Sequence, residues 1–169
     1  KFERNPMKSL KFNISSRAGF VFAAAALSAS VVFAGGIHGG GHDESPIGEP
    51  GVAAKVSRTI EVDAADNMRF TPSNVSVKRG ETIRFVVKNS GKVPHEFSLG
   101  TEKDLKEHYE AMKKFPNMEH EEANKISLQP GKQGEVIWRF TEAGIVNFAC
   151  LYVGHYEAGM KGQVKVTAK

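Results

Sequence analysis

Three side chains that bind soft metal ions lie at intervals of five residues near the end of the sequence: Cys150, His155 and Met160. A thiolate, an imidazole and a thioether, joined by a second imidazole, form the His2Cys set with a weak axial Met that selects copper and suits it to electron transfer. His95, in the stretch Val-Pro-His-Glu-Phe, is the candidate for the second imidazole. The sequence therefore predicts a copper site of His95, Cys150, His155 and Met160, provided that the fold brings His95 to the later stretch.

The first 34 residues have the pattern of a secretory signal peptide. Five Lys and Arg residues precede or flank an alanine-rich apolar run at 18–34, which ends in Val-Phe-Ala before two glycines. A retained membrane anchor or a buried helix is the alternative, but the run is short for a membrane span of ~20 residues, and no stop-transfer flank follows it. We expect residues 1–34 to be removed and the mature protein to be periplasmic.

Removal of this segment changes the charge of the protein. It takes away five of the 23 Lys and Arg residues and one of the 19 Asp and Glu residues, which leaves 18 of each. A nearly neutral chain without a basic patch indicates no nucleic-acid partner, and we expect no membrane association after the signal is removed. The single cysteine of an exported chain cannot form an internal disulfide, so it is either a free thiol or a metal ligand.

Residues 35–56 contain glycine, histidine, acidic residues and two prolines, without apolar periodicity. This composition predicts a flexible leader. His38 and His42, separated by three glycines, could hold a metal ion loosely. The alternative is a solvated linker, because ordering two histidines on glycines has a large entropic cost.

From residue 57 onward, short runs that alternate apolar and polar side chains are separated by turn residues. This texture predicts an all-β fold, a Greek-key β-sandwich of about eight strands, in a domain spanning 57–169. The alternating runs lie at 59–62, 68–70, 75–77, 82–88, 96–99, 125–128, 135–140, 145–150 and 162–167.

One helix, at about 101–116, interrupts the strands. Apolar residues recur at helical spacing from Leu105 to Phe115, and Pro116 ends the run. Thr101 and Asp104 have the spacing of a capping box, with Asp in place of the longer Glu.

Together these residues resemble the cupredoxins, the small blue copper proteins such as azurin, plastocyanin, auracyanin and rusticyanin. The resemblance rests on Val-Pro-His95-Glu-Phe, on Asn147-Phe-Ala-Cys150-x4-His155-x4-Met160, and on the opening hairpin that begins at Met68. It implies one type 1 copper with three equatorial ligands, His95, Cys150 and His155, and Met160 as the weak axial ligand. Within the family, the chain is most similar to periplasmic cupredoxins associated with copper tolerance.

Two positions depart from the family pattern. Glu96 stands where the family often has Asn or Ser, so a side-chain link to the cysteine loop must differ. No proline lies two residues after Cys150, so the Tyr152 N–H can donate to the sulfur, together with the Glu96 N–H. Hydrogen bonds to the sulfur stabilise the thiolate, and we expect them to favour Cu(I) and raise the reduction potential.

The family resemblance implies a protein that carries single electrons by cycling between Cu(II) and Cu(I). We expect a monomer that docks briefly on redox partner proteins through the exposed edge of His155, which is ringed by Val93, Pro94, Leu151 and Gly154. We expect no enzyme activity, because neither a nucleophile–base pair nor paired acid–base carboxylates can be found in the sequence. A type 2 copper or zinc enzyme would also need an open coordination position, for which four ligands leave little room.

An alternative function follows from the helical insertion. His108 and Met112 are spaced i, i+4 and share a helix face, and further Met and His residues follow the helix. If these bind additional copper, the protein is a copper-tolerance factor that sequesters the metal. Otherwise Met112 packs inward and the remaining residues are solvated. The candidate accessory ligands are His108, Met112, Met118, His120, His38 and His42.

Overall fold

A computed structural model of the chain describes residues 45–115 and 122–168. The predicted signal peptide and the first part of the predicted leader, with His38 and His42, lie outside these ranges. Within them, none of the helices has the length and apolar character that crossing a membrane requires.

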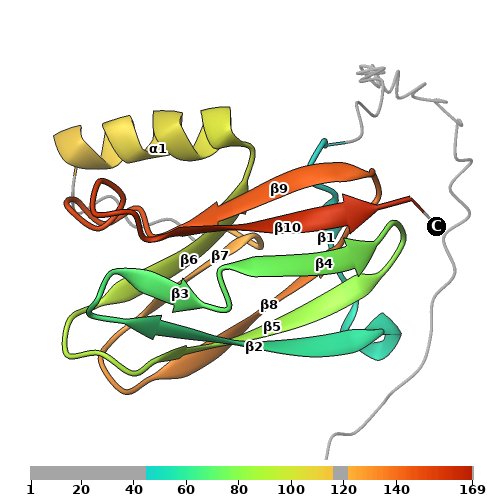
Figure 1. Cartoon of the computed structure of the whole chain (residues 1–169), viewed down its shortest axis with the longest axis horizontal. Helices are drawn as coiled ribbons and strands as arrows, with labels where there is room; N and C mark the ends of the chain where they lie inside the picture. Colours follow the sequence, from blue (N-terminus) through green and yellow to red (C-terminus); the bar gives the residue numbers. More distant parts are fainter. Residues whose placement is uncertain (1–44, 116–121, 169) are drawn as a thin grey trace, which may run out of the picture. The chain divides into compact units, whose positions relative to one another are not determined.

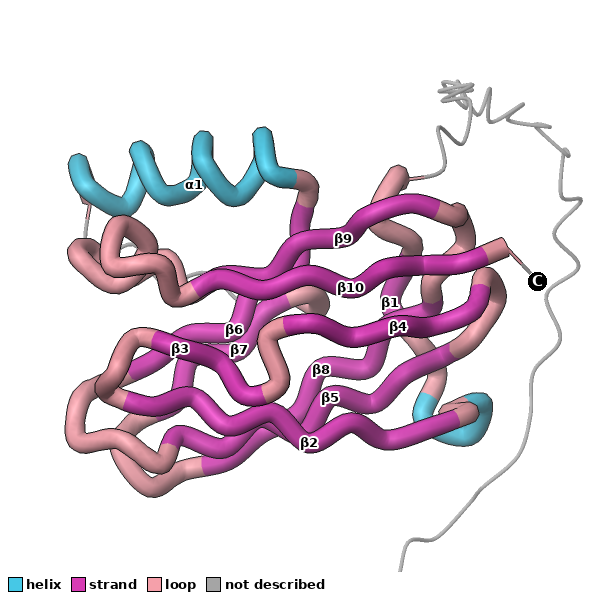
Figure 2. Tube along the Cα trace, viewed as in Figure 1, coloured by secondary structure: helices cyan, strands magenta, loops and turns pink. Residues whose placement is uncertain are grey.

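Two five-stranded sheets pack face to face, and one helix lies on the outside of the second sheet (Figures 1 and 2). The predicted all-β sandwich with a single inserted helix is therefore confirmed. The first sheet contains, in spatial order, β1 (Glu49–Pro50), β8 (Gln133–Arg139), β5 (Thr82–Asn89), β2 (Arg58–Ala65) and β3 (Arg69–Thr71). The second sheet contains β4 (Asn74–Lys78), β10 (Lys161–Thr167), β9 (Gly144–Ala149), β6 (His95–Gly100) and β7 (Lys125–Leu128).

Alternating side chains explain why these segments form a sandwich. On β5, Ile83, Phe85 and Val87 are buried at period two and face the opposite sheet. The same strand pairs in parallel with β2 and antiparallel with β8, so it is the centre of its sheet. Burial of one face of each sheet against the other supplies the hydrophobic core.

The centre of the core is a cluster of four phenylalanines that joins the two sheets. Phe70 and Phe85 come from the first sheet, and Phe97 and Phe148 come from the second. The ring centroids of Phe97 and Phe148 are 4.9 Å apart. The Phe70 centroid lies 5.7 Å from that of Phe97 and 5.4 Å from that of Phe148. The Phe85 centroid lies 5.4 Å from that of Phe97. Phe97 follows His95 by two residues and Phe148 precedes Cys150 by two, so this cluster supports both strands that carry predicted ligands.

The predicted helix is α1 (Glu102–Lys114), and its N-terminus is capped as the sequence indicates. The Asp104 backbone N–H donates to the Thr101 hydroxyl oxygen at 3.1 Å. Leu105, Tyr109 and Met112 form the buried face of the helix. This face lies over β6 and β9 of the second sheet (Figure 1).

Residues 45–56 differ from the predicted flexible leader. They contain β1 and a short 3-10 helix, η1 (Ala53–Lys55), and β1 pairs with β8. Ile47 is buried, and its carbonyl accepts a hydrogen bond from the Trp138 indole N–H at 2.6 Å. This segment therefore has a defined structure because it contacts residues about ninety positions away along the chain. Its own composition does not reveal these contacts.

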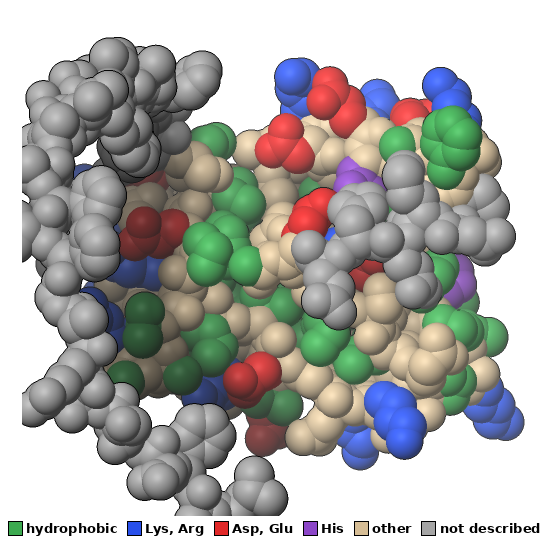
Figure 3. Space-filling view, turned by 180° about the vertical axis from the view of Figure 1, so that it is seen from behind, with side chains coloured by type: hydrophobic (Ala, Val, Ile, Leu, Met, Phe, Trp, Pro, Cys, Tyr) green, Lys and Arg blue, Asp and Glu red, His purple; other side chains and the backbone are tan. Residues whose placement is uncertain are grey.

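The surface charge agrees with a nearly neutral chain. On the face shown in Figure 3, basic and acidic side chains both occur across the surface among apolar and neutral groups.

The phenylalanine cluster generates a prediction for stability. Phe97→Ala is expected to lower the free energy of unfolding by about 3–5 kcal/mol, because it removes a ring that is fully buried between both sheets. Chemical denaturation checks this. Ile145→Ala is the control, because Ile145 is an apolar strand residue that is 50% exposed, and a comparable loss in both variants would contradict the role of the cluster.

Candidate metal centre

Three neighbouring strands of the second sheet bring the predicted ligands to one end of the sandwich. His95 is the first residue of β6, Cys150 directly follows β9, and Met160 directly precedes β10. β9 lies between the other two strands and pairs antiparallel with both. Antiparallel pairing places the start of β6 beside the end of β9, so His95 reaches the loop at 150–160.

The structure brings His95, Cys150 and His155 together. Their ligand atoms all lie within 4.8 Å of one another, and the Cys150 Sγ is 3.3 Å from the His155 Nδ1. His95 and Cys150 are fully buried, whereas His155 is half-buried. One sulfur and two imidazole nitrogens in this arrangement can bind a single ion.

Met160 is also fully buried and belongs to the same core cluster as Cys150. Its backbone closes the loop: its carbonyl accepts from the Cys150 N–H at 3.0 Å, and its N–H donates to the His155 carbonyl at 3.0 Å. These bonds hold three of the predicted ligands in one small ring of backbone. The role of the Met160 thioether as axial ligand stays a prediction.

Two backbone N–H groups are directed at the cysteine sulfur. The Glu96 N–H donates to the Cys150 Sγ at 3.3 Å, and the Tyr152 N–H also hydrogen-bonds to it. Both donors were predicted from the sequence and are confirmed. Burial nevertheless raises the pKa of the Cys150 thiol to about 12, and the two N–H groups only partly offset this effect. Metal binding near neutral pH must therefore displace the thiol proton.

The His155 imidazole is in a form that can bind a metal ion. Burial lowers its pKa, as does the nearby His95, while Asp66 has the opposite effect. The imidazole is therefore neutral at pH 7, which is the form that binds metals.

His95 provides the strongest test of whether a metal fits. Its Nε2 lies 3.2 Å from the Asp66 carboxylate, and its Nδ1 is buried without a hydrogen-bond partner among the described residues. Since a carboxylate only accepts, Nε2 is the donor, and in the neutral tautomer this leaves the lone pair on Nδ1. A buried polar atom without a partner calls for an explanation, and a metal ion bound at this nitrogen supplies one.

The loop before His95 depends on two residues whose roles the sequence did not indicate. The Asn89 side chain donates to the carbonyls of Val93 at 2.8 Å and Leu128 at 3.0 Å. Asp66 accepts from the Lys92 N–H at 2.7 Å, and this bond is the main reason why its pKa is lowered. Asn and Asp are common at turns, and the sequence does not reveal their distant contacts: Asn89 reaches Leu128, 39 residues away, and Asp66 reaches Lys92 and His95, 26 and 29 residues away.

Glu96 departs from the family pattern without disturbing the site. Its carboxylate accepts hydrogen bonds from the hydroxyls of Ser98 at 2.7 Å and Ser127 at 3.4 Å. The side chain is thereby satisfied within β6 and β7, while its backbone N–H still serves the sulfur.

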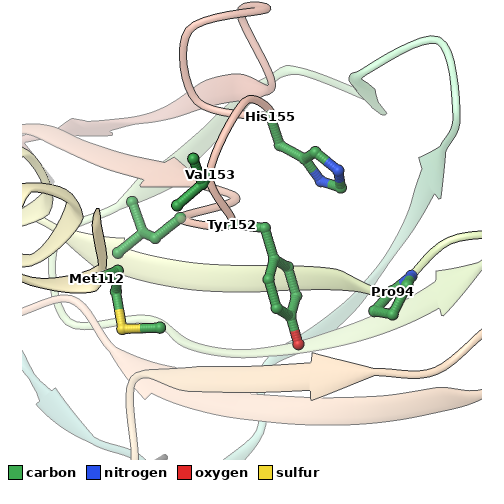
Figure 4. A pocket seen from close by; sticks show the side chains of 6 residues that line it. Pro94, Met112, Tyr152, Val153 and His155 are labelled. Carbon is green, nitrogen blue, oxygen red and sulfur yellow. The ribbon is translucent and has the colours of Figure 1, made fainter. Parts of the chain in front are cut away.

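The half-buried His155 borders an apolar hollow of about 240 Å³ (Figure 4). Val153, on its wall, is 55% exposed, whereas Leu151 is buried. The exposed edge predicted around His155 is thus present in part, with Met112, Tyr152 and Val153 as additional neighbours. The residues that line the hollow are Pro94, Met112, Leu151, Tyr152, Val153 and His155.

The structure describes only some of the predicted accessory copper ligands. Met112 is buried beside Leu105 and Tyr109 and lines this hollow, so it packs inward, as expected if the helix holds no accessory copper. His108 is half-buried on the same helix. Met118 and His120 lie outside the described residues, as His38 and His42 do.

The helix α1 is fastened to the ligand loop. Tyr109 stacks on Tyr156 with ring centroids 4.8 Å apart and an interplanar angle of 23°, and its hydroxyl donates to the Glu157 carboxylate. The Lys161 ammonium lies 3.5 Å from the centre of the Tyr156 ring on which Tyr109 stacks. The insertion therefore helps to fix the loop that carries His155.

Comparison with known proteins agrees with this geometry. The model of the family "Copper binding proteins, plastocyanin/azurin family" matches residues 56–167. The chain belongs to this family. Its cupredoxin fold is shared with auracyanin B (TM-score 0.59, 24% identity, 73% of this chain and 99% of that chain). The reduced auracyanin of Roseiflexus castenholzii is also similar (TM-score 0.56, 24% identity, 66% and 98%).

Two curated relatives are more similar in sequence. The copper-resistant cuproprotein CopI of Rubrivivax gelatinosus is 47% identical over 135 residues, covering 78% of this chain and 82% of the relative. The protein of the same name from Pseudomonas aeruginosa is 36% identical over 174 residues, covering 83% and 96%. This cupredoxin is therefore a copper-binding protein, and the donors found in the structure fit copper, which in these sites undergoes one-electron redox change.

The hydrogen bonds to the sulfur generate a prediction for the reduction potential. Tyr152→Pro removes one N–H donor and is expected to lower the potential by an amount on the order of 1 kcal/mol, about one net hydrogen bond. The reason is that Cu(I) leaves more charge on the sulfur than Cu(II) does, so it gains more from the bond. Voltammetry measures the change.

Tyr152→Ala is the matched control, since it removes the same side chain and keeps the N–H. An unchanged potential in Tyr152→Pro, or an equal drop in the control, would show that this N–H does not tune the site.

Proposed function

We propose that this cupredoxin is a copper-tolerance factor that is exported to the periplasm and binds copper there. The observation that carries the proposal is the buried set of soft donors in a chain that is 47% identical to a copper-resistant cuproprotein. Copper is, in this function, the cargo that the protein removes from solution. The alternative interpretation of the sequence is thus preferred to simple electron transport.

The geometry supports tight retention of the cargo. His95 and Cys150 are inaccessible to solvent, and the backbone ring through Met160 holds the loop closed around them. A site that exists before the metal arrives loses little conformational entropy on binding. His155, beside the hollow, is the most exposed of the three assembled donors and is the side from which copper would enter.

Export supports the same function. The basic and apolar pattern of residues 1–34 predicts a signal peptide, and a lone cysteine that binds metal is protected from pairing with other thiols. The periplasm, where we place the mature protein, is where a tolerance factor would meet incoming copper.

A second candidate function, single-electron transfer, is favoured by one specific observation. The apolar hollow lies directly beside His155, and the exposed Val153 stands on its wall. An apolar surface over a ligand suits brief contact with redox partner proteins. Catalysis is not part of either proposal, because the predicted fourth ligand, Met160, would leave no open coordination position for a substrate.

Growth of a host strain that lacks this protein, on increasing copper, tests the two functions. We expect the wild-type chain to restore tolerance and Cys150→Ser to lose it, because the thiolate is the strongest donor of the set. Val153→Asp places a charge beside the hollow without touching a ligand, so we expect it to retain tolerance. Loss of tolerance in Val153→Asp, with copper still bound, would assign tolerance to electron transfer through this surface.

Full tolerance with Cys150→Ser would contradict a role of this site. The copper content of the purified mature chain is the accompanying measurement. More than one tightly bound copper per chain would assign part of the capacity to additional Met and His residues.

A further inference from the structure

Asp66 makes an unusual set of contacts at the turn between β2 and β3. One of its carboxylate oxygens lies 3.2 Å from the His95 Nε2 and 3.4 Å from the Val93 N–H, and the other accepts from the Lys92 N–H at 2.7 Å. A single carboxylate therefore fixes both the predicted ligand and the loop that leads to it.

The close approach of this loop is built into the sequence at Gly91. A Cβ atom added to Gly91 would lie 1.9 Å from the Asp66 Oδ1 and 3.1 Å from the His95 Nε2. No other residue than glycine leaves room for the carboxylate at this point. The Gly91 N–H also donates to the Asn89 side chain at 2.9 Å, so the loop is held on both sides.

A carboxylate on the far nitrogen of a ligating histidine has two effects. It orients the ring and selects the tautomer, and it increases the electron density that the other nitrogen can donate to the metal. The extra donation favours Cu(II) over Cu(I), because the ion of higher charge gains more from a stronger donor. This effect opposes that of the two N–H groups on the sulfur, which favour Cu(I).

We propose that Asp66 is a positioning residue that acts through His95 to bias the site toward Cu(II) and to lower its reduction potential. This inference rests on copper binding at the site, as the proposed function does. It adds a residue from a turn between two strands of the first sheet to a site whose predicted ligands all come from the second sheet and its loops.

Voltammetry of the copper-loaded protein tests the proposal with Asp66→Asn. The amide keeps the size of the side chain but removes the charge, and outer partners of this kind typically change metal affinity 10–100-fold. We expect the preference for Cu(II) over Cu(I) to fall about tenfold, which corresponds to a rise in potential of about 59 mV for one electron.

Asp63→Asn is the matched control. Asp63 lies on β2, three residues before Asp66, and its carboxylate accepts a hydrogen bond at 2.8 Å from the hydroxyl of Ser90, in the loop that Asp66 also contacts. The Asp63→Asn substitution removes a negative charge close to the site, as Asp66→Asn does, but it removes no contact with His95. An equal rise in both variants would reduce the effect to general electrostatics, and no rise in Asp66→Asn would also overturn the proposal.

Gly91→Ala provides a second, independent variant, because its methyl group displaces the carboxylate without changing any charge. We expect its potential to rise as well, and this variant decides the matter if Asp66→Asn does not fold. Failure of the proposed function would be distinguishable, because the wild-type chain would then bind no copper at the site or confer no tolerance.

Discussion

The structure of the site depends on the buried Cys150 sulfur, which lies close to two imidazole nitrogens and accepts hydrogen bonds from two backbone N–H groups. Burial is the main reason why the pKa of this thiol is raised to about 12, so that without a bound cation the thiol stays protonated near neutral pH. A bound cation reverses that preference, because a coordinated thiolate no longer needs solvent to stabilise its charge. A bound cation therefore suits this buried thiol, and β6, β9 and β10 position the residues that would hold it.

The groups around the ligands act in opposite directions on the metal. Hydrogen bonds from Glu96 and Tyr152 withdraw charge from the sulfur, while the Asp66 carboxylate strengthens the donation from His95. The balance between them, and not the ligand set alone, sets the relative stability of the two copper states. The helix α1 adds rigidity, because Tyr109 stacks on the ligand loop and binds Glu157. This contact gives the insertion a structural role that requires no metal of its own.

Much of this architecture could be predicted from the sequence because the signals are local. Alternation of apolar residues, as at Ile83, Phe85 and Val87, indicated the strands, and the spacing of Cys150 and His155 indicated the ligand loop. The defined structure of residues 45–56 could not be predicted, because the position of Ile47 depends on a hydrogen bond from Trp138 on a distant strand. Asp66 and Asn89 were missed because Asp and Asn are common at turns, and only the folded chain shows that Asp66 reaches His95 and that Asn89 reaches Leu128.

Titration of the purified apoprotein with Cu(II), followed by visible absorption, tests whether Cys150 holds copper as a thiolate ligand. We expect an intense thiolate-to-Cu(II) charge-transfer band that saturates at one copper per chain, as is typical of a His2Cys site with a weak axial ligand. The same titration of Cys150→Ser should not produce this band. Only weak absorption from the wild-type protein, or an equally intense band from Cys150→Ser, would contradict a copper centre at Cys150.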